Sequence, residues 1–460
     1  LTGCLNRRSC GPAIDALVAA AEARGNAVAV LMADLDNFKQ INDLNGHHTG
    51  DAVLTAISSR LTEGLPEISC VARIGGDEFV CAFEYRLGED DRVDQLAADL
   101  IAAVSAPIED RGSRVEATVS FGISSSADER PVEDVSTSEI LIHRADVAMY
   151  EAKTHGRNRY FWFEPQMEDR LRERHELERG IRLGIPAGEF VPYYEQQIDL
   201  QSGELVGFEM LARWHSPTLG VVGPEVFIPI AEENDLIAAL SESLIRQALE
   251  DAREWDPRLT LSVNISPLQL RDPWFAQKLL QMLGEAGFPP QRLEIEITES
   301  CVHENIAGVR AIVQSLKNQG MRISLDDFGT GYSSISQLRS LPFDRLKVDR
   351  SFVAELSKDE ANIELVQAII GLGKGLALPV TAEGVESPKV LEALLGMGQL
   401  KGQGYFYGMP EDASTTRARL ARMELLRKDC EDPISAALAD GGLPRAIDGP
   451  AGSAIVRKAG

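Results

Sequence analysis

The chain has 460 residues, more than one compact domain normally contains, so we expect two domains. Acidic residues outnumber basic ones by 71 to 46, and the formal net charge of −25 argues against binding to nucleic acid or to an anionic membrane surface. The hydrophobic content of 44% is that of an ordinary globular protein. No apolar run reaches the ~20 residues that a membrane-spanning helix needs, so we expect no membrane contact in this chain.

Cysteine usage and the first residue bear on cellular location. The six cysteines, at positions 4, 10, 70, 81, 301 and 430, show neither CxxC spacing nor the density of a disulfide framework. This pattern favours reduced thiols and a cytoplasmic location. The sequence begins with Leu1 instead of Met, so we expect a fragment of a longer protein, which a preceding region could tether to the inner membrane.

The first predicted domain, residues 1–164, is of the α+β class. Its apolar run 28–33 predicts a buried strand that ends at two acids, Asp34 and Asp36. The alternating segment 71–81 predicts a hairpin with an acidic, glycine-containing tip. The residues of this tip are Gly75, Gly76, Asp77 and Glu78. Two amphipathic helices and a further strand are expected at 51–61, 93–104 and 115–123.

A nearly uninterrupted charge run follows the first domain. Over residues 165–184 the regular apolar positions are Leu171, Leu177 and Ile181, which predicts an exposed linker helix. Its charges either form a solvated face of i,i+4 pairs or belong to a segment that transmits a signal between the domains.

The most informative feature is a series of apolar strands that each end in an acid or an amide. These strands are 206–209, 261–264, 293–296, 323–327, 346–349 and 380–383. Helical patterns alternate with them, for example at 236–252, 309–319 and 363–372. The alternation predicts a (β/α)₈ TIM-type barrel over residues 185–412, whose strand ends converge on one open face. A helix and a mobile tail are expected over residues 413–460.

So many carboxylates in one barrel mouth would repel one another unless cations neutralise them. Oxygen ligands without His or Cys suit Mg²⁺ or Mn²⁺. The adjacent Asp326 and Asp327 could bridge two ions, and Lys347 could position or deprotonate a water molecule. This set of residues favours phosphodiester hydrolysis over a chance gathering of solvated strand ends.

The first domain has a smaller candidate site at the end of its buried strand. Asp34 and Asp77 can share a metal ion with the carbonyl oxygen of Leu35, which is enough to hold a triphosphate. Positive charge for phosphoryl transfer would come from Lys39, Lys153 and Arg157.

The motifs of this domain resemble the GGDEF family of diguanylate cyclases. The matching pieces include 34–39, 41–43, 73–79, 119–122, 145–150 and 156–158. The resemblance implies that two GTP molecules are joined between two facing domains, and therefore a homodimer. It implies Mg²⁺ on Asp34, Leu35 and Asp77, catalytic roles for Asp77 and Lys39, and substrate contacts from Asn42, Asp51, Gly76, Glu78, Lys153 and Arg157.

The second domain resembles the EAL family of cyclic di-GMP phosphodiesterases. The matching pieces include 209–214, 264–266, 296–300, 326–334, 346–349, 382–386 and 403–405. The resemblance implies metal ligation by Glu209, Asn264, Glu296, Asp326, Asp327, Asp349 and Glu383. It further implies catalytic roles for Lys347 and Glu383, substrate contacts from Arg213 and Gln403, and stabilisation of the 326–334 loop by Glu299.

Three departures from these families bear on activity. The RxxD product-inhibition motif of many cyclases is replaced by Pro66 and Ser69, which puts feedback inhibition in doubt. The signature alanine of the second family is Met210, which should point away from the mouth because it alternates with Glu209. The segment 194–197, Tyr-Glu-Gln-Gln, stands where that family has Tyr-Gln-Pro-Ile, and it puts a charge near the nucleotide pocket.

Three functional hypotheses remain open from the sequence. The preferred one is a bifunctional enzyme that makes and linearises cyclic di-GMP. In the second, the barrel is a phosphodiesterase and the first domain is a GTP-binding allosteric regulator. In the third, the chain is a non-catalytic cyclic di-GMP receptor. Turnover of pure GTP and of cyclic di-GMP distinguishes them.

Overall fold

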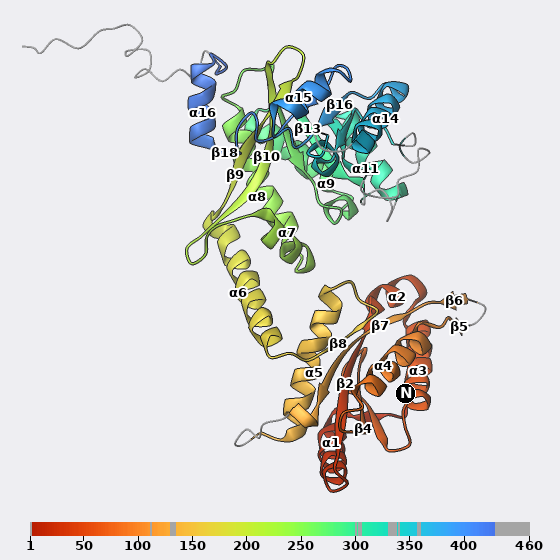
Figure 1. Cartoon of the computed structure of the whole chain (residues 1–460). Helices are drawn as coiled ribbons and strands as arrows, with labels where there is room; N and C mark the ends of the chain where they lie inside the picture. Colours follow the sequence, from red (N-terminus) through yellow and green to blue (C-terminus); the bar gives the residue numbers. More distant parts are fainter. Residues whose placement is uncertain are drawn as a thin grey trace, which may run out of the picture. The chain divides into compact units, whose positions relative to one another are not determined.

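The computed structural model describes residues 2–110, 113–128, 135–299, 301, 306–329, 338, 341–356 and 360–427. The chain forms two compact units, Leu1–Glu176 and Leu177–Gly460 (Figure 1). The tail that the sequence analysis expects to be mobile lies, beyond residue 427, outside the described residues. The residue limits given above for the domains stay a prediction.

The first unit is built on a mixed sheet with helices on both faces. In spatial order its strands are β1 (Leu5–Asn6), β3 (Ser69–Arg73), β4 (Glu78–Arg86), β2 (Asn26–Asp36), β7 (Thr118–Ser125) and β8 (Tyr160–Trp162). The helices are α1 (Arg7–Glu22), α2 (Phe38–Asn45), α3 (His47–Gly64), α4 (Asp90–Ser105) and α5 (Thr137–Thr154).

Strand β2 is buried on both faces, as its continuous apolar run predicts. Val28 and Val30 pack with residues of α1 and α5 on one face. Ala29 and Leu31 pack with residues of α3 and α4 on the other. This central position brings Asp34, near the end of β2, next to the starts of its antiparallel neighbours β4 and β7.

The predicted hairpin is present, but the predicted strand 115–123 is wrong in its bounds. Strands β3 and β4 pair antiparallel, and the Ile74 amide donates to the Glu78 carbonyl, which closes the hairpin. Val115 belongs instead to a separate two-stranded ribbon, β5 (Ile108–Asp110) with β6 (Ser113–Val115). The chain joins the main sheet only from Thr118 onward, because pairing with β5 holds the preceding residues away from β2.

The second unit is a closed barrel, and the predicted fold class is confirmed. Around the barrel the strands are β10 (Leu205–Ser216), β12 (Thr260–Asn264), β13 (Leu293–Thr298), β14 (Arg322–Phe328), β15 (Arg345–Val348), β16 (Val380–Ala382), β17 (Lys401–Gly402) and β9 (Phe190–Asp199). The ring closes where β9 pairs with β10. Neighbours from β10 to β17 are parallel, whereas β9 is antiparallel to both of its neighbours. Short strands β11 (Gly220–Val222) and β18 (Glu411–Asp412) extend the sheet at β10 and β9.

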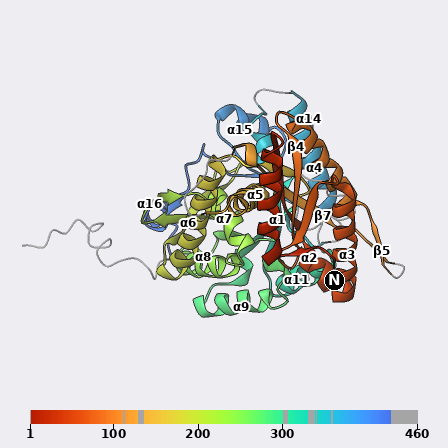
Figure 2. The same cartoon turned by 90° about the horizontal axis from the view of Figure 1, so that it is seen from below.

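Helices surround the barrel on its outside (Figures 1 and 2). They are α7 (Pro224–Glu233), α8 (Ile237–Ala252), α9 (Phe275–Ala286), α11 (Ile306–Asn318), α13 (Arg350–Val353), α14 (Glu360–Leu376) and α15 (Pro388–Leu395). Buried side chains from these helices and from the outward faces of the strands form one continuous apolar core. The barrel wall is therefore rigid where the inward-facing polar residues are mounted.

Two further helices complete the described chain, and the first of them runs across the boundary between the two units at residues 176 and 177. The charge run forms α6 (Gln166–Ala187), within which Met167 and Ile181 are buried. Helix α16 (Ala413–Arg422) follows β18 and is shorter than the helical pattern after Pro410 suggests. Among the described residues, no helix has both the length and the apolar character needed to cross a membrane.

Candidate active site

A single buried lysine lies among four carboxylates inside the barrel. Lys347, on β15, is fully buried. Its Nζ lies 3.2 Å from a carboxylate oxygen of Glu209, 2.5 Å from Glu296, 3.0 Å from Asp326 and 2.6 Å from Glu383. One ammonium group therefore faces four acids, and the cluster carries an excess of negative charge.

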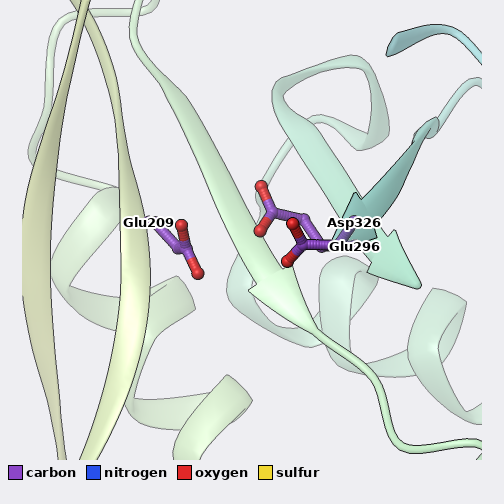
Figure 3. A group of neighbouring side chains, drawn as sticks. All are labelled: Glu209, Glu296 and Asp326. Carbon is purple, nitrogen blue, oxygen red and sulfur yellow. The ribbon is translucent and has the colours of Figure 1, made fainter. Parts of the chain in front are cut away.

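The parallel register of the strands brings these acids together. Glu209, Glu296 and Asp326 come from β10, β13 and β14, and Figure 3 shows their carboxyl groups turned toward one another. One oxygen from each lies within 4.8 Å of the others. A second group with the same spacing consists of Asp326, Asp327 and Glu383. Asp326 belongs to both groups, so the two candidate cation positions are adjacent.

Burial and crowding shift the pKa values of several groups in and beside the cluster. Burial and the neighbouring charge of Glu209 raise the pKa of Glu296 well above its usual value. Burial raises the pKa of Glu383 in the same way, although Lys347 opposes this. The pKa of Asp327 is raised to about 6 by burial and by Asp326. Burial would lower the pKa of Lys347, but the surrounding acids raise it, so the ammonium form is retained.

The donor set fits a hard divalent cation. It consists of carboxylate oxygens and the amide of Asn264, the ligand type that Mg²⁺ and Mn²⁺ prefer. Within the part of the chain that the structure describes, Oε1 of Glu296 is buried and has no hydrogen-bond partner. A buried carboxylate oxygen without a partner is costly. A cation beside it would remove that cost.

Two side-chain amides, the exposed Asn264 and the buried Gln403, each donate to one oxygen of the Glu209 carboxylate. Nδ2 of Asn264 donates to Oε1 of Glu209 at 2.6 Å, and Nε2 of Gln403 donates to Oε2 at 2.6 Å. Burial alone would raise the pKa of Glu209, but Lys347 and these two amides outweigh it and lower the pKa. Glu209 is therefore held in its ionised form.

A cavity of about 260 Å³ opens onto the cluster. Glu209, Asp326 and Glu383 line its floor, and Glu195, Arg213 and Tyr405 are among its other lining residues. The guanidinium of Arg213 lies 5.6 Å from the ring centroid of Tyr193. Burial and the charge of Glu209 raise the pKa of Glu195 to about 7. The cavity thus offers a cation and aromatic surface for a nucleotide above the acids.

Three other residues singled out in the barrel sequence have separate positions. Asp349 is in neither acidic group and caps α13 by accepting from the Ser351 amide at 3.0 Å. Glu299 accepts from the Gly329 amide at 3.1 Å, within the 326–334 loop that it is expected to stabilise; residues 330–334 of this loop lie outside the described residues. Met210 is buried in the apolar core outside the barrel wall, as its alternation with Glu209 predicts.

A second polar layer, which the sequence analysis missed, lies one pleat below the acids. Glu294 accepts from Ser324 Oγ and lies 3.0 Å from Arg345 Nε. Burial and the charge of Arg345 lower the pKa of Lys401 to about 8. Each of these residues comes two positions before a residue of the acidic cluster or its hydrogen-bond partners. The two-residue alternation of a strand therefore could have indicated that they also point into the barrel.

The predicted site of the first unit is assembled at the end of β2. Asp34 Oδ1 lies 2.9 Å from Lys153 Nζ, and the Leu35 amide donates to the Asp77 carbonyl at 3.4 Å. Burial raises the pKa of Asp34; Lys153 opposes this, whereas Asp77 and Glu78 add to it. The strand end and the hairpin tip therefore form one acidic patch with a lysine on it.

The remaining predicted nucleotide contacts lie on helices and loops. A Cβ atom on Gly50 would lie 2.0 Å from Oδ1 of Asn42, so α2 and α3 approach closely beside Asp51. Lys39 and Arg157 are exposed. The structure thus places Asn42 next to the residue that precedes Asp51, and leaves the two cations open to solvent.

Asp36 is a buried acid to which the sequence analysis gave no role. It accepts from Thr118 Oγ1 and Ser120 Oγ at 2.7 Å each, and from the Asn158 amide at 3.1 Å. These bonds tie β2 to β7 and to the loop after α5. Its role is to fix the loop that carries Arg157.

Comparison with known families agrees with this architecture. Residues 1–159 match the family described as diguanylate cyclase, GGDEF domain, and residues 153–410 match the family described as EAL domain. An uncharacterised signalling protein of Caulobacter vibrioides is 40% identical over 89% of this chain and 50% of its own length. The bifunctional diguanylate cyclase/cyclic di-GMP phosphodiesterase MucR of Pseudomonas aeruginosa is 34% identical over 85% of this chain and 57% of its own length.

A solved structure supports the fold of the barrel. The PaMucR phosphodiesterase in complex with c-di-GMP is 33% identical, with a TM-score of 0.51, and the match covers 52% of this chain and 99% of that one. The chain spans about half the length of the curated relatives it matches. From the matched families and the assembled sites, the chain belongs to the proteins that carry a GGDEF domain followed by an EAL domain.

Proposed function

We propose that the barrel hydrolyses cyclic di-GMP to linear pGpG with Mg²⁺ or Mn²⁺ as cofactor. The observation that carries this proposal is the set of four carboxylates around Lys347 at the floor of an open cavity. This cluster has too much negative charge to serve stability alone, because buried carboxylates in excess of cations are destabilising. It suits a reaction in which phosphate and metal charge are brought together.

The cation would be held by Glu209, Asn264, Glu296, Asp326, Asp327 and Glu383, with Asp349 nearby. When bound, it polarises a phosphoryl oxygen and makes a water molecule more acidic. Lys347 holds the acids in place by donating hydrogen bonds to Glu209 and Asp326, and its ammonium group would also donate to the reacting oxygen. Arg213 and Gln403 line the cavity where the substrate phosphate and sugar would lie.

For the first unit, we propose binding of GTP and its condensation to cyclic di-GMP in a homodimer. The support is the patch formed by Asp34, Asp77 and Lys153 at the end of β2, which suits a metal-bound triphosphate. The hypothesis that this unit only binds GTP and regulates the barrel uses the same residues. Turnover decides between these two hypotheses.

The test is nucleotide chromatography of the purified chain with Mg²⁺, supplied separately with GTP and with cyclic di-GMP. We expect pGpG from cyclic di-GMP, and cyclic di-GMP or pGpG from GTP. Glu209→Ala should abolish hydrolysis without affecting GTP turnover, and Asp77→Ala should do the converse. Glu204→Ala, an exposed acid ahead of β10, is the matched control and should behave as the unchanged chain.

Each alternative has its own result. GTP that stays unconverted but stimulates hydrolysis would replace the cyclase with a GTP-binding regulator. Binding of cyclic di-GMP without conversion would replace the phosphodiesterase with a receptor. Full hydrolysis by Glu209→Ala would refute the assignment of the active site.

A further inference from the structure

Strand β9 places a glutamine inside the barrel, below the acidic cluster. Gln197 is 2% exposed and lies in the Tyr-Glu-Gln-Gln segment that departs from the family pattern. It faces the barrel interior because it alternates with Gln196, which turns outward and donates to the Tyr407 carbonyl. Gln197 is not one of the described residues that line the cavity. Any role in catalysis must therefore pass through another side chain.

The contacts of Gln197 form a chain that leads to the proposed metal site. Its Nε2 donates to Ser262 Oγ at 3.2 Å and to Gln403 Oε1 at 3.3 Å. Gln403 in turn uses its own Nε2 to donate to Glu209 at 2.6 Å and to Glu383 at 3.4 Å. The two amides thus connect β9 to two acids of the cluster through hydrogen bonds that all run in one direction.

The direction of these bonds follows from charge. The amide of Gln403 has a donor end and an acceptor end, and two carboxylates face it. They accept from the NH₂ group and would repel the carbonyl oxygen, so the oxygen must point away, into the barrel. A buried carbonyl there needs a donor, and Gln197 supplies it. Without that donor, Gln403 would lose the partner that fixes its orientation.

One side-chain atom of Gln197 is unfavourably placed. Its Oε1 is buried and, within the described residues, has no hydrogen-bond partner. An apolar residue of similar size would avoid this cost, so stability alone does not explain a glutamine here. The unpaired oxygen is the consequence of aiming the NH₂ group of Gln197 at Gln403.

We propose that Gln197 is a positioning residue that, through Gln403, holds the carboxylate of Glu209 in the geometry required to bind a divalent cation. The inference rests on the proposed function for its metal site, but not on hydrolysis itself. Outer residues that orient metal ligands change metal affinity by about 10–100-fold when they are replaced. Since Gln197 acts one step further out, we expect the lower end of that range.

The test measures Mn²⁺ binding to the whole chain by isothermal titration calorimetry. All proteins carry Asp77→Ala, which removes the metal site proposed for the first unit. Gln197→Leu should weaken Mn²⁺ binding by about tenfold. Gln197→Met, which keeps an unbranched side chain, should do the same and replaces the Leu variant if that one does not fold. The matched control is Gln196→Leu, on the opposite face of β9, which should bind Mn²⁺ normally.

A double-mutant cycle shows whether the effect passes through Gln403. In a Gln403→Ala background, Gln197→Leu should cause no further loss of Mn²⁺ affinity. With Mn²⁺ at saturation, the KM for cyclic di-GMP should change less than twofold, since Gln197 does not line the cavity. Unchanged Mn²⁺ affinity in both Gln197 variants overturns the proposal, as does an equal loss in the Gln403→Ala background.

The outcomes for this inference and for the proposed function are separable. If the unchanged chain binds Mn²⁺ at the barrel but does not hydrolyse cyclic di-GMP, the proposed function fails while the affinity comparison still tests Gln197. If hydrolysis is present and the Gln197 variants bind Mn²⁺ normally, the positioning role fails while the function stands.

Discussion

Replacing Lys347 with methionine removes the cation of the barrel cluster and leaves a side chain of similar length. In the present structure its ammonium group lies within 3.2 Å of oxygens of four acids. Breaking a buried ion pair by removing one partner costs about 3–5 kcal/mol, because the remaining charge is buried without compensation. At roughly 2–4 °C per kcal/mol for a domain of this size, the metal-free barrel should lose about 6–20 °C in Tm.

The loss should depend on pH with a definite sign. Burial and crowding already raise the pKa of Glu296 and Glu383, and removing the lysine raises the pKa of both further. A carboxyl group whose pKa is raised on folding contributes stability below its unfolded pKa and loses that contribution as pH rises through its folded pKa. The Lys347→Met variant should therefore be less destabilised at pH 5 than at pH 8.

The assay is thermal unfolding in chelator and in Mn²⁺, together with hydrolysis of cyclic di-GMP. Mn²⁺ should restore most of the lost Tm, whereas hydrolysis should stay reduced by about 10²–10³-fold, the usual effect of losing one hydrogen-bond donor to the charge that develops in the transition state. Lys401→Met is the matched control, because burial and Arg345 lower the pKa of Lys401 to about 8 and its charge is already disfavoured. A metal-free Lys347→Met barrel with unchanged Tm would refute the charge argument.

Three other predictions follow from the same contacts. Glu195→Gln removes from the cavity wall a carboxyl group whose pKa is about 7. The KM for cyclic di-GMP at pH 8 should therefore fall by about tenfold, the equivalent of about 1.4 kcal/mol, and should no longer rise between pH 6 and pH 8. An unchanged pH profile of KM would contradict this. The Mn²⁺ affinity of the barrel should increase from pH 6 to pH 8, because Asp327, with a pKa of about 6, and its neighbours must lose protons to bind metal. Equal affinity at the two pH values in calorimetry would count against these acids as ligands. Gly50→Ala should displace the Asn42 side chain and weaken GTP binding without lowering the Tm of the first unit. Equilibrium binding of GTP at normal affinity would exclude the substrate contact implied for Asn42.

Much of the fold could be predicted because its signals are local. The continuous apolar run before Asp34 indicates a strand buried on both faces, and the structure covers it with helices on each side. The barrel strands could be recognised from the acids that end them. The antiparallel direction of β9 could not be predicted, because it depends on pairing with β10 and β17 and leaves no periodic pattern in the sequence. The same holds for Val115, whose partner in the β5–β6 ribbon decides its strand.

The candidate site divides in the same way. Carboxylates at strand ends could be predicted to meet, because parallel strands present their ends at one face of a barrel. The contacts of Gln403 could not be predicted. The family resemblance implies only a substrate contact, whereas in the structure the amide of Gln403 donates to Glu209 and Glu383. Such hydrogen bonds depend on side-chain rotation within the assembled interior, and Gln197, its partner, lies more than two hundred positions away in the sequence.

The arrangement of charge explains why one set of residues serves both stability and chemistry. Four acids around one ammonium group are tolerated only with additional positive charge or with protons on some of the acids. A bound divalent cation and a bound proton therefore compete for the same oxygens. One of these is Oε1 of Glu296, which is buried and has no hydrogen-bond partner within the described part of the chain. At 100 times its Kd, a cation that binds only the folded barrel adds about 2.7 kcal/mol of stability. In the proposed function, the repulsion between the acids therefore favours the binding of a divalent cation, which would in turn bind the phosphodiester at the mouth of the barrel.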